Sequence, residues 1–277
     1  MTAQQSMERA ARSSARSGGV GALYSGEFPA VIGRGLRATK SSNYIVVLSG
    51  FFEPIFYLLS LGLGLGSYIG AVHDGGHLIP YAAYIAPGLL AVSAMNGAIY
   101  DSTWNVFFKM HFGKLYEGML ATSLGPLDVA LGEILLALLR GGLYAVGFLI
   151  VMQALGLVLA WTALLALPAV LLIAFGFASL GMAITSYLKT FQQMDWINFA
   201  LLPMFLLSAT FYPLSVYPVP IQWIIQALPL WQAVDMLRQF TTGYIEPSMG
   251  IHLLYYAALI AVGLMFTTRR LRALFLD

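Results

Sequence analysis

The chain has 277 residues, of which 59% are hydrophobic and only 9% are charged. Soluble domains carry about 25% charged residues, so this composition excludes a water-facing globule, and lipid must be the main solvent of the surface. The sequence contains no cysteine, which excludes disulfides, zinc–thiolate sites and thiol nucleophiles. Its length fits one membrane domain without an attached nucleotide-binding domain, and the net charge of +2 gives no reason to expect a nucleic-acid partner.

The N-terminal region divides into two parts. Residues 1–26 are rich in Ser, Ala, Gly and Arg and lack the apolar run of a signal peptide, so we expect a flexible cytoplasmic tail. Residues 27–42 place apolar side chains at helical spacing with cations between them, which predicts an amphipathic helix in the inner membrane interface. A solvated basic linker is the alternative, since a proline and two glycines weaken the helix. The residues that represent this interfacial helix are Phe28, Ile32, Arg34 and Arg37.

Six apolar segments follow along the chain. A hydrocarbon core about 30 Å thick requires about 20 apolar residues in a helix. We therefore expect an all-α membrane protein with six transmembrane helices. The segments are 44–66, 81–107, 127–157, 161–187, 196–212 and 251–267.

The stretch 213–250, before the last span, contains five prolines and several polar side chains. Proline breaks a helix interior, so we expect two short helices that separate at Pro229 and form a re-entrant hairpin on the outer side. Asp235 and Arg238 are three residues apart, and we expect them to meet on one helix face. They hold the hairpin in shape or, in the alternative interpretation, latch one state of transport.

The positions of the basic residues indicate the orientation. Cytoplasmic loops carry the excess of Lys and Arg. With six spans and a cytoplasmic N-terminus, only Arg140 and Arg238 of the 14 basic residues lie away from the cytoplasmic side. We therefore expect a multi-pass protein of the bacterial inner or plasma membrane with both termini in the cytoplasm.

The predicted spans contain five charged residues, and three of them are candidate pathway or structural charges: Glu53, Glu133 and Arg140. Charges at membrane depth usually face the protein interior, pair with one another or line a polar path. Glu133 and Arg140 are about 10 Å apart along a helix axis, so they cannot pair directly. A structural role and a role in the transport pathway are equally compatible with these positions.

The cytoplasmic loop between the second and third spans mixes charged and large apolar residues before a Gly-Pro breaker. We expect a short helix there that exposes Tyr116, Met119 and Leu120 to a partner protein. Lys109, Lys114 and Glu117 complete this candidate docking surface.

Motifs for catalysis are missing from the sequence. The only Gly-Lys pair, Gly113-Lys114, is followed by Leu115 and lacks the spacing of a phosphate-binding loop. The four histidines have no metal-ligand spacing with a carboxylate, and no serine-centred nucleophile motif occurs. We therefore expect no catalytic residues, no metal site and no enzyme activity on this chain.

Four places in the sequence resemble the permease subunits of type-2 ABC exporters, and among these the NodJ-type lipooligosaccharide export permeases. The resemblance runs from about residue 42 to the C-terminus, in the order of the predicted spans. The matching places are EPIFYL at 53–58 leading into LGLGLG at 61–66, YEGMLAT at 116–122 followed by GE at 132–133, FASLGM at 177–182, and LPLWQAVDMLR at 228–238.

The resemblance implies that residues 27–277 form a type-2 ABC transporter transmembrane domain. Such a permease pairs with a second copy or a paralogue, and separate ATPase subunits bind ATP and Mg²⁺. Residues 109–125 correspond to the coupling helix, the interfacial helix also touches the ATPase, and residues 213–243 line or cap the exit. The implied substrate is an amphiphile such as a lipid-linked glycan or lipooligosaccharide. The alternatives are a drug or antibiotic efflux permease of the same family, an ion-coupled secondary transporter that uses Glu133 and Arg140, and a membrane scaffold.

Overall fold

The computed structural model describes residues 24–40, 52 and 55–275, and nearly all of the described elements are helical. In the first half of the chain these are α3 (Phe28–Lys40), the π-helix η1 (Leu58–Leu65), α5 (Gly66–Ile69), β1 (Ala71–Asp74), β2 (His77–Pro80), α6 (Tyr81–Tyr100), the π-helix η2 (Asp101–Asn105), α7 (Val106–His111) and α8 (Leu115–Leu120). The second half contains α9 (Pro126–Ala154), η3 (Trp161–Leu165), α10 (Ala166–Tyr187), η4 (Phe191–Met194), α11 (Asp195–Leu207), η5 (Leu214–Val216), α12 (Val219–Ala227), α13 (Pro229–Thr242) and α14 (Met249–Phe275).

Among the described residues, four helices are long and apolar enough to cross a membrane. They match the second, third, fourth and sixth predicted segments, and the prediction is confirmed for these. They are Tyr81–His111, which combines α6, η2 and α7, together with Pro126–Ala154, Trp161–Tyr187 and Met249–Phe275.

The first and fifth predicted segments are less complete. Much of segment 44–66 lies outside the described residues, and its described part belongs to a shorter apolar helix, Ile55–Ile69. The fifth segment was predicted to run to residue 212, but α11 ends at Leu207. The chain turns there, and Ala209 adopts a positive φ of 53°. The 13 residues of α11 rise about 20 Å, which is less than the thickness of the hydrocarbon core.

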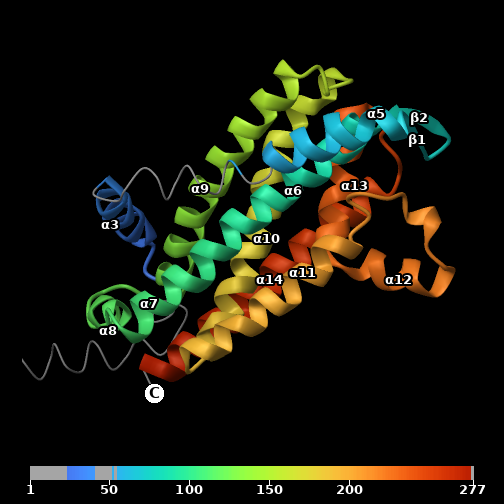
Figure 1. Cartoon of the computed structure of the whole chain (residues 1–277). Helices are drawn as coiled ribbons and strands as arrows, with labels where there is room; N and C mark the ends of the chain where they lie inside the picture. The colour runs from blue at the N-terminus through green and yellow to red at the C-terminus, as the bar shows by residue number, and fades with distance from the viewer. Residues whose placement is uncertain (1–23, 41–51, 53–54, 276–277) are drawn as a thin grey trace, which may run out of the picture.

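Helix α6 is the centre of the bundle and packs against α9, α10 and α13 (Figure 1). Nearly all of its side chains are buried, because it has neighbours on every side. A Cβ atom added at Gly97 would lie 3.1 Å from the Tyr144 ring and 3.3 Å from the Gly141 backbone. Small residues therefore allow α6 and α9 to approach closely, as they do in many membrane bundles.

Helices α10 and α14 also pack closely along much of their length. A Cβ atom added at Gly263 would lie only 2.7 Å from the Ser179 backbone, and one at Gly176 would lie 2.5 Å from the Tyr256 ring. Gly176 on α10 and Gly263 on α14 therefore allow the last predicted span to pack closely against the fourth.

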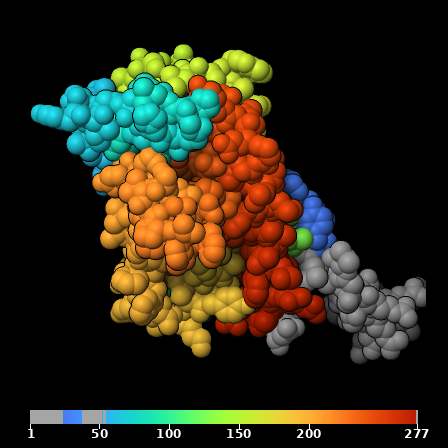
Figure 2. Space-filling view, turned by 90° about the vertical axis from the view of Figure 1, so that its right-hand side faces the viewer, coloured from blue at the N-terminus to red at the C-terminus, as the bar shows by residue number. Residues whose placement is uncertain are grey.

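The hairpin predicted within residues 213–250 contains two short helices that separate where the sequence indicated. Leu228 is extended, and Pro229 begins α13 directly after it. Helix α13 packs against α6, whereas α12 projects away from the bundle (Figure 1). The space-filling view shows this segment covering the middle of one face beside α14 (Figure 2).

A small antiparallel β-hairpin, made by β1 and β2, joins the first helical segment to α6, and the sequence analysis did not predict it. Its turn is Gly75-Gly76, and both glycines have positive φ, as tight hairpin turns require. The His77 ring stacks on Tyr244 with 3.5 Å between centroids. This contact ties the hairpin to the loop that follows α13.

Candidate functional site

Helix α3 docks on α9 at the end of the bundle where α7 and α8 also lie (Figure 1). The side chain of Val31 is buried against Gly132, where an added Cβ atom would lie 2.5 Å from the Val31 Cβ. Gly35 similarly accommodates Leu136. Phe28 and Ile32 are half-buried and Arg37 is exposed. The predicted helix is therefore confirmed, with one face held by the bundle.

The chain immediately before α3 is fixed by Asp128. The Asp128 carboxylate accepts hydrogen bonds from the Ser25 backbone N–H at 2.7 Å, the Gly26 N–H at 3.1 Å and the Gly125 N–H at 3.0 Å. Asp128 is the third residue of α9, and its bond with the Gly125 N–H also caps the N-terminus of that helix. Ser25 and Gly26 thus belong to the folded domain, whereas residues 1–23 of the predicted tail lie outside the described residues.

Glu133 joins three elements at the same end of the molecule. Its side chain is only 3% exposed, its Oε2 accepts a hydrogen bond from Lys109 Nζ at 2.5 Å, and its Oε1 lies 3.8 Å from Arg34 Nη2. Arg34 comes from α3, Lys109 from α7 and Glu133 from α9. The sequence analysis assigned Arg34 to the predicted interfacial helix, Lys109 to the docking surface and Glu133 to the charges within the spans. The structure brings all three together.

Arg140 has its own partner. Its Nη1 donates to Asp101 Oδ1 at 2.6 Å, so Arg140 and Glu133 do not pair directly, as their spacing predicted. Asp101 begins the π-helical turn η2. Such turns are frequent at functional sites, and Asp101 was not among the predicted site residues. Glu53, the remaining predicted intramembrane charge, lies outside the described residues.

The short helix predicted in the loop between the second and third spans is α8, but its exposed face was assigned wrongly. Tyr116, Met119 and Leu120 are buried in the chain itself. They share one face because they are spaced three and four residues apart, and that face packs inward. The exposed side of α8 instead carries Glu117, with Lys114 just before the helix.

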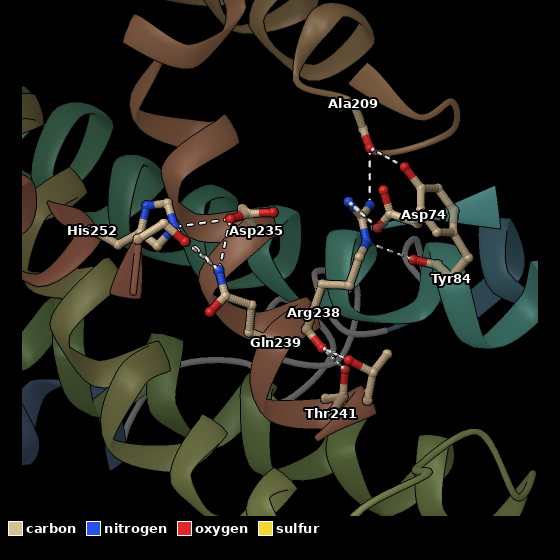
Figure 3. Close-up of polar contacts among 10 residues, drawn as sticks. Asp74, Tyr84, Ala209, Asp235, Arg238, Gln239, Thr241 and His252 are labelled. Atoms are coloured by element: carbon tan, nitrogen blue, oxygen red, sulfur yellow. Dashed lines mark hydrogen bonds and ion pairs between the residues drawn. The ribbon is translucent and has the colours of Figure 1, made fainter. Parts of the chain in front are cut away.

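A second polar cluster surrounds Arg238 on α13 (Figure 3). The Arg238 side chain is 7% exposed, its Nη2 donates to the Ala209 carbonyl at 2.9 Å, and its Nε lies 3.4 Å from the Tyr84 carbonyl. The guanidinium lies 3.8 Å from the centre of the Tyr84 ring, and Nη1 lies 3.8 Å from Asp74 Oδ2. Arg238 therefore connects α13 to α6, to β1 and to the turn after α11.

The expected pairing of Asp235 with Arg238 is wrong. Asp235 Oδ2 instead lies 2.9 Å from His252 Nε2 and accepts a hydrogen bond from Gln239 Nε2 at 2.9 Å (Figure 3). Burial raises the pKa of Asp235, but the hydrogen bonds from His252 and Gln239 and the nearby Arg238 charge lower it below its ordinary value. The two side chains lean to different neighbours, Asp235 toward α14 and Arg238 toward α6.

Residues 26–241 match the family described as ABC-2 type transporter. The chain belongs to this family. ABC-2 permeases are the membrane components of transporters rather than enzymes, and they work with ABC ATPase partners. The match begins just before α3 and ends within α13, so it includes both polar clusters except His252.

Curated relatives of this ABC-2 permease have similar lengths. Nodulation protein J of Rhizobium leguminosarum bv. viciae is 32% identical over 245 residues, which cover 88% of this chain and 93% of the relative. Nodulation protein J of Rhizobium meliloti is 29% identical over 245 residues, 88% of this chain and 92% of the relative. The protein of that name from Neorhizobium galegae is 30% identical over 248 residues, 87% and 93% of the two chains. With its apolar helices, the chain is a multi-pass membrane permease.

Proposed function

We propose that this chain is the permease subunit of an ATP-driven exporter that moves an amphiphilic substrate outward. The observation that carries the proposal is the ABC-2 family match over residues 26–241. Because the sequence has no phosphate-binding loop, ATP and Mg²⁺ bind separate ATPase subunits. A second copy or a paralogue completes the translocation path.

The proposed architecture has six spans, cytoplasmic termini, an interfacial α3 and an outer re-entrant hairpin made by α12 and α13. The asymmetry of the basic residues supports the orientation. The last helix also ends in a basic stretch, since Arg269, Arg270 and Arg272 lie in its final turns. This end belongs with α3 and α8 on the cytoplasmic side.

The orientation is testable by cysteine labelling, because the chain contains no native cysteine. An impermeant thiol reagent applied to whole cells should label Pro220→Cys, on the exposed start of α12, but not Gln5→Cys or Phe275→Cys. Permeabilised cells serve as the control and should allow labelling at all three positions. The reverse pattern in intact cells would rule out this topology.

The proposed docking surface for the ATPase is the exposed side of α8, with Glu117 at its centre. Its buried side, which carries Tyr116, packs against the chain itself. Movement of α8 would be passed on through Lys109 and Glu133 to α3 and α9, because the 2.5 Å hydrogen bond links the end of α7 to the third span. This connection supports a path from the ATPase to the membrane helices.

The lining of a cleft of about 220 Å³ supports the proposal that the substrate is amphiphilic. Apolar side chains line most of it, including Tyr57, Leu89 and Phe205, and the amides of Asn96 and Asn198 add hydrogen-bonding groups. The cleft lies between the first, second and fifth predicted spans. A lipid-linked glycan or lipooligosaccharide is our preferred substrate, given the Nodulation protein J relatives. A drug efflux permease would use the same cleft.

An ion-coupled secondary transporter is less compatible with the charges. Such a mechanism requires an intramembrane carboxylate that can bind and release an ion. Glu133 is held by Lys109, and Arg140 is held by Asp101. Both charged residues thus act as links between helices rather than as open ion sites.

Affinity capture tests the proposal. Tagged chain, expressed in its source cells and solubilised in mild detergent, should retain an ABC ATPase subunit that mass spectrometry identifies. The captured complex should hydrolyse ATP in a vanadate-sensitive manner. Capture of the intact chain without any ABC ATPase would contradict the proposal.

A further inference from the structure

A charged cavity opens beside the interfacial helix, between α3, the η2–α7 segment and α9. Its volume is about 370 Å³. Three cations line it, from Arg34, Lys109 and Arg140, together with two carboxylates, from Asp101 and Glu133. The charged residues that line the cavity therefore carry a formal excess of one positive charge.

The excess positive charge belongs to Arg34. Lys109 and Arg140 each have a close carboxylate partner, at 2.5 Å and 2.6 Å. Arg34 has only the 3.8 Å approach to Glu133 among the described residues, and its side chain is 41% exposed. The guanidinium is therefore accessible from the cavity and suited to an additional, negatively charged acceptor.

An apolar stripe leads away from the cavity along α9. Leu139 and Leu143 line the cavity and continue into Val146 and Ile150, with spacings of four, three and four residues that keep them on one helix face. Leu143 is 63% exposed and Ile150 is 64% exposed. From Leu139 to Ile150 the helix rises about 16 Å, which is close to the hydrocarbon depth of one leaflet, about 15 Å.

We propose that this cavity binds the phosphodiester headgroup of an inner-leaflet phospholipid. Arg34 is the principal phosphate ligand, because a guanidinium matches phosphate oxygens in geometry and charge. The acyl chains lie along the stripe on α9. Since Arg34 belongs to α3 and the stripe to α9, the bound lipid fastens the interfacial helix to the third span.

Thermal unfolding of the delipidated full chain in dodecyl maltoside tests this site. Dioleoyl phosphatidylglycerol should raise the unfolding temperature, and native mass spectrometry should detect one retained lipid. Dioleoylglycerol, which has the same chains without phosphate, should have no such effect, and neither should inorganic phosphate. Equal stabilisation by dioleoylglycerol would overturn the phosphate contact, and equal stabilisation by inorganic phosphate would overturn the lipid assignment.

Two variants separate the headgroup from the acyl chains. Arg34→Gln should weaken phosphatidylglycerol binding about tenfold, since a hydrogen bond to a charged group contributes roughly 1.5 kcal/mol or more. Arg37→Gln, on the same helix but outside the cavity, is the matched control and should bind normally. The double variant Leu139→Asn, Leu143→Asn leaves every charge in place and should also weaken binding. Unchanged binding in both test variants would refute the proposal.

Discussion

Replacing Arg238 with alanine should lower both the thermal unfolding temperature and the yield of the purified protein. The change removes two hydrogen bonds to backbone carbonyls, the contact with the Tyr84 ring and the ion pair with Asp74. Breaking a buried charged network of this kind costs roughly 3 kcal/mol. Because these contacts connect α13 to α6 and β1, the whole end of the bundle that carries the β-hairpin should loosen.

Arg37→Ala is the matched control, since Arg37 is exposed on α3 and its loss should leave the unfolding temperature nearly unchanged. Arg238→Lys should retain the charge but lose the fork of donors that reaches Ala209 and Tyr84, so an intermediate loss is expected. Normal stability of Arg238→Ala combined with lost transport would instead support the latch interpretation of the hairpin.

Glu117→Lys should uncouple ATP hydrolysis from transport and reduce transport about tenfold or more. Glu117 lies on the exposed side of α8, where we place the ATPase. A reversed charge at a docking surface adds like-charge contacts that cost several kcal/mol. The amount of inserted protein should stay normal, because no buried contact is lost. The ratio of substrate transported to ATP hydrolysed in proteoliposomes measures the effect.

Asp195→Lys makes the same charge change at another exposed position and should leave coupling intact. Met119→Asp would not test docking, because Met119 is buried and a carboxylate there would destabilise α8 itself. If Glu117→Lys transports as efficiently as the unmodified chain, α8 is not the coupling helix.

Local sequence signals predicted most of the helical framework. Four spans were recognisable because about 20 apolar residues in succession leave few alternatives. The break at Pro229 was equally local, since proline cannot continue a preceding helix. The β-hairpin at 71–80 was missed because its strands have only four residues each, and the Gly75-Gly76 turn was its main signal.

The sequence did not predict which side chains pair with one another in the two polar clusters. Lys109 and Glu133 are 24 residues apart, and they meet only because α9 packs against η2, which α7 continues. Asp235 and Arg238 are near in sequence, yet the neighbouring helices offer each a better partner. The buried side of α8 was misjudged for the same reason, since an amphipathic pattern does not tell which protein covers its apolar face.

The most direct test of an ATP-driven permease is transport into inside-out proteoliposomes that contain this chain and its ABC ATPase. A fluorescent lipooligosaccharide should accumulate inside only when ATP and Mg²⁺ are present and both proteins are included. Ionophores that dissipate proton and sodium gradients should not reduce the initial rate. Accumulation that needs an ion gradient and proceeds without ATP or the ATPase would contradict the account.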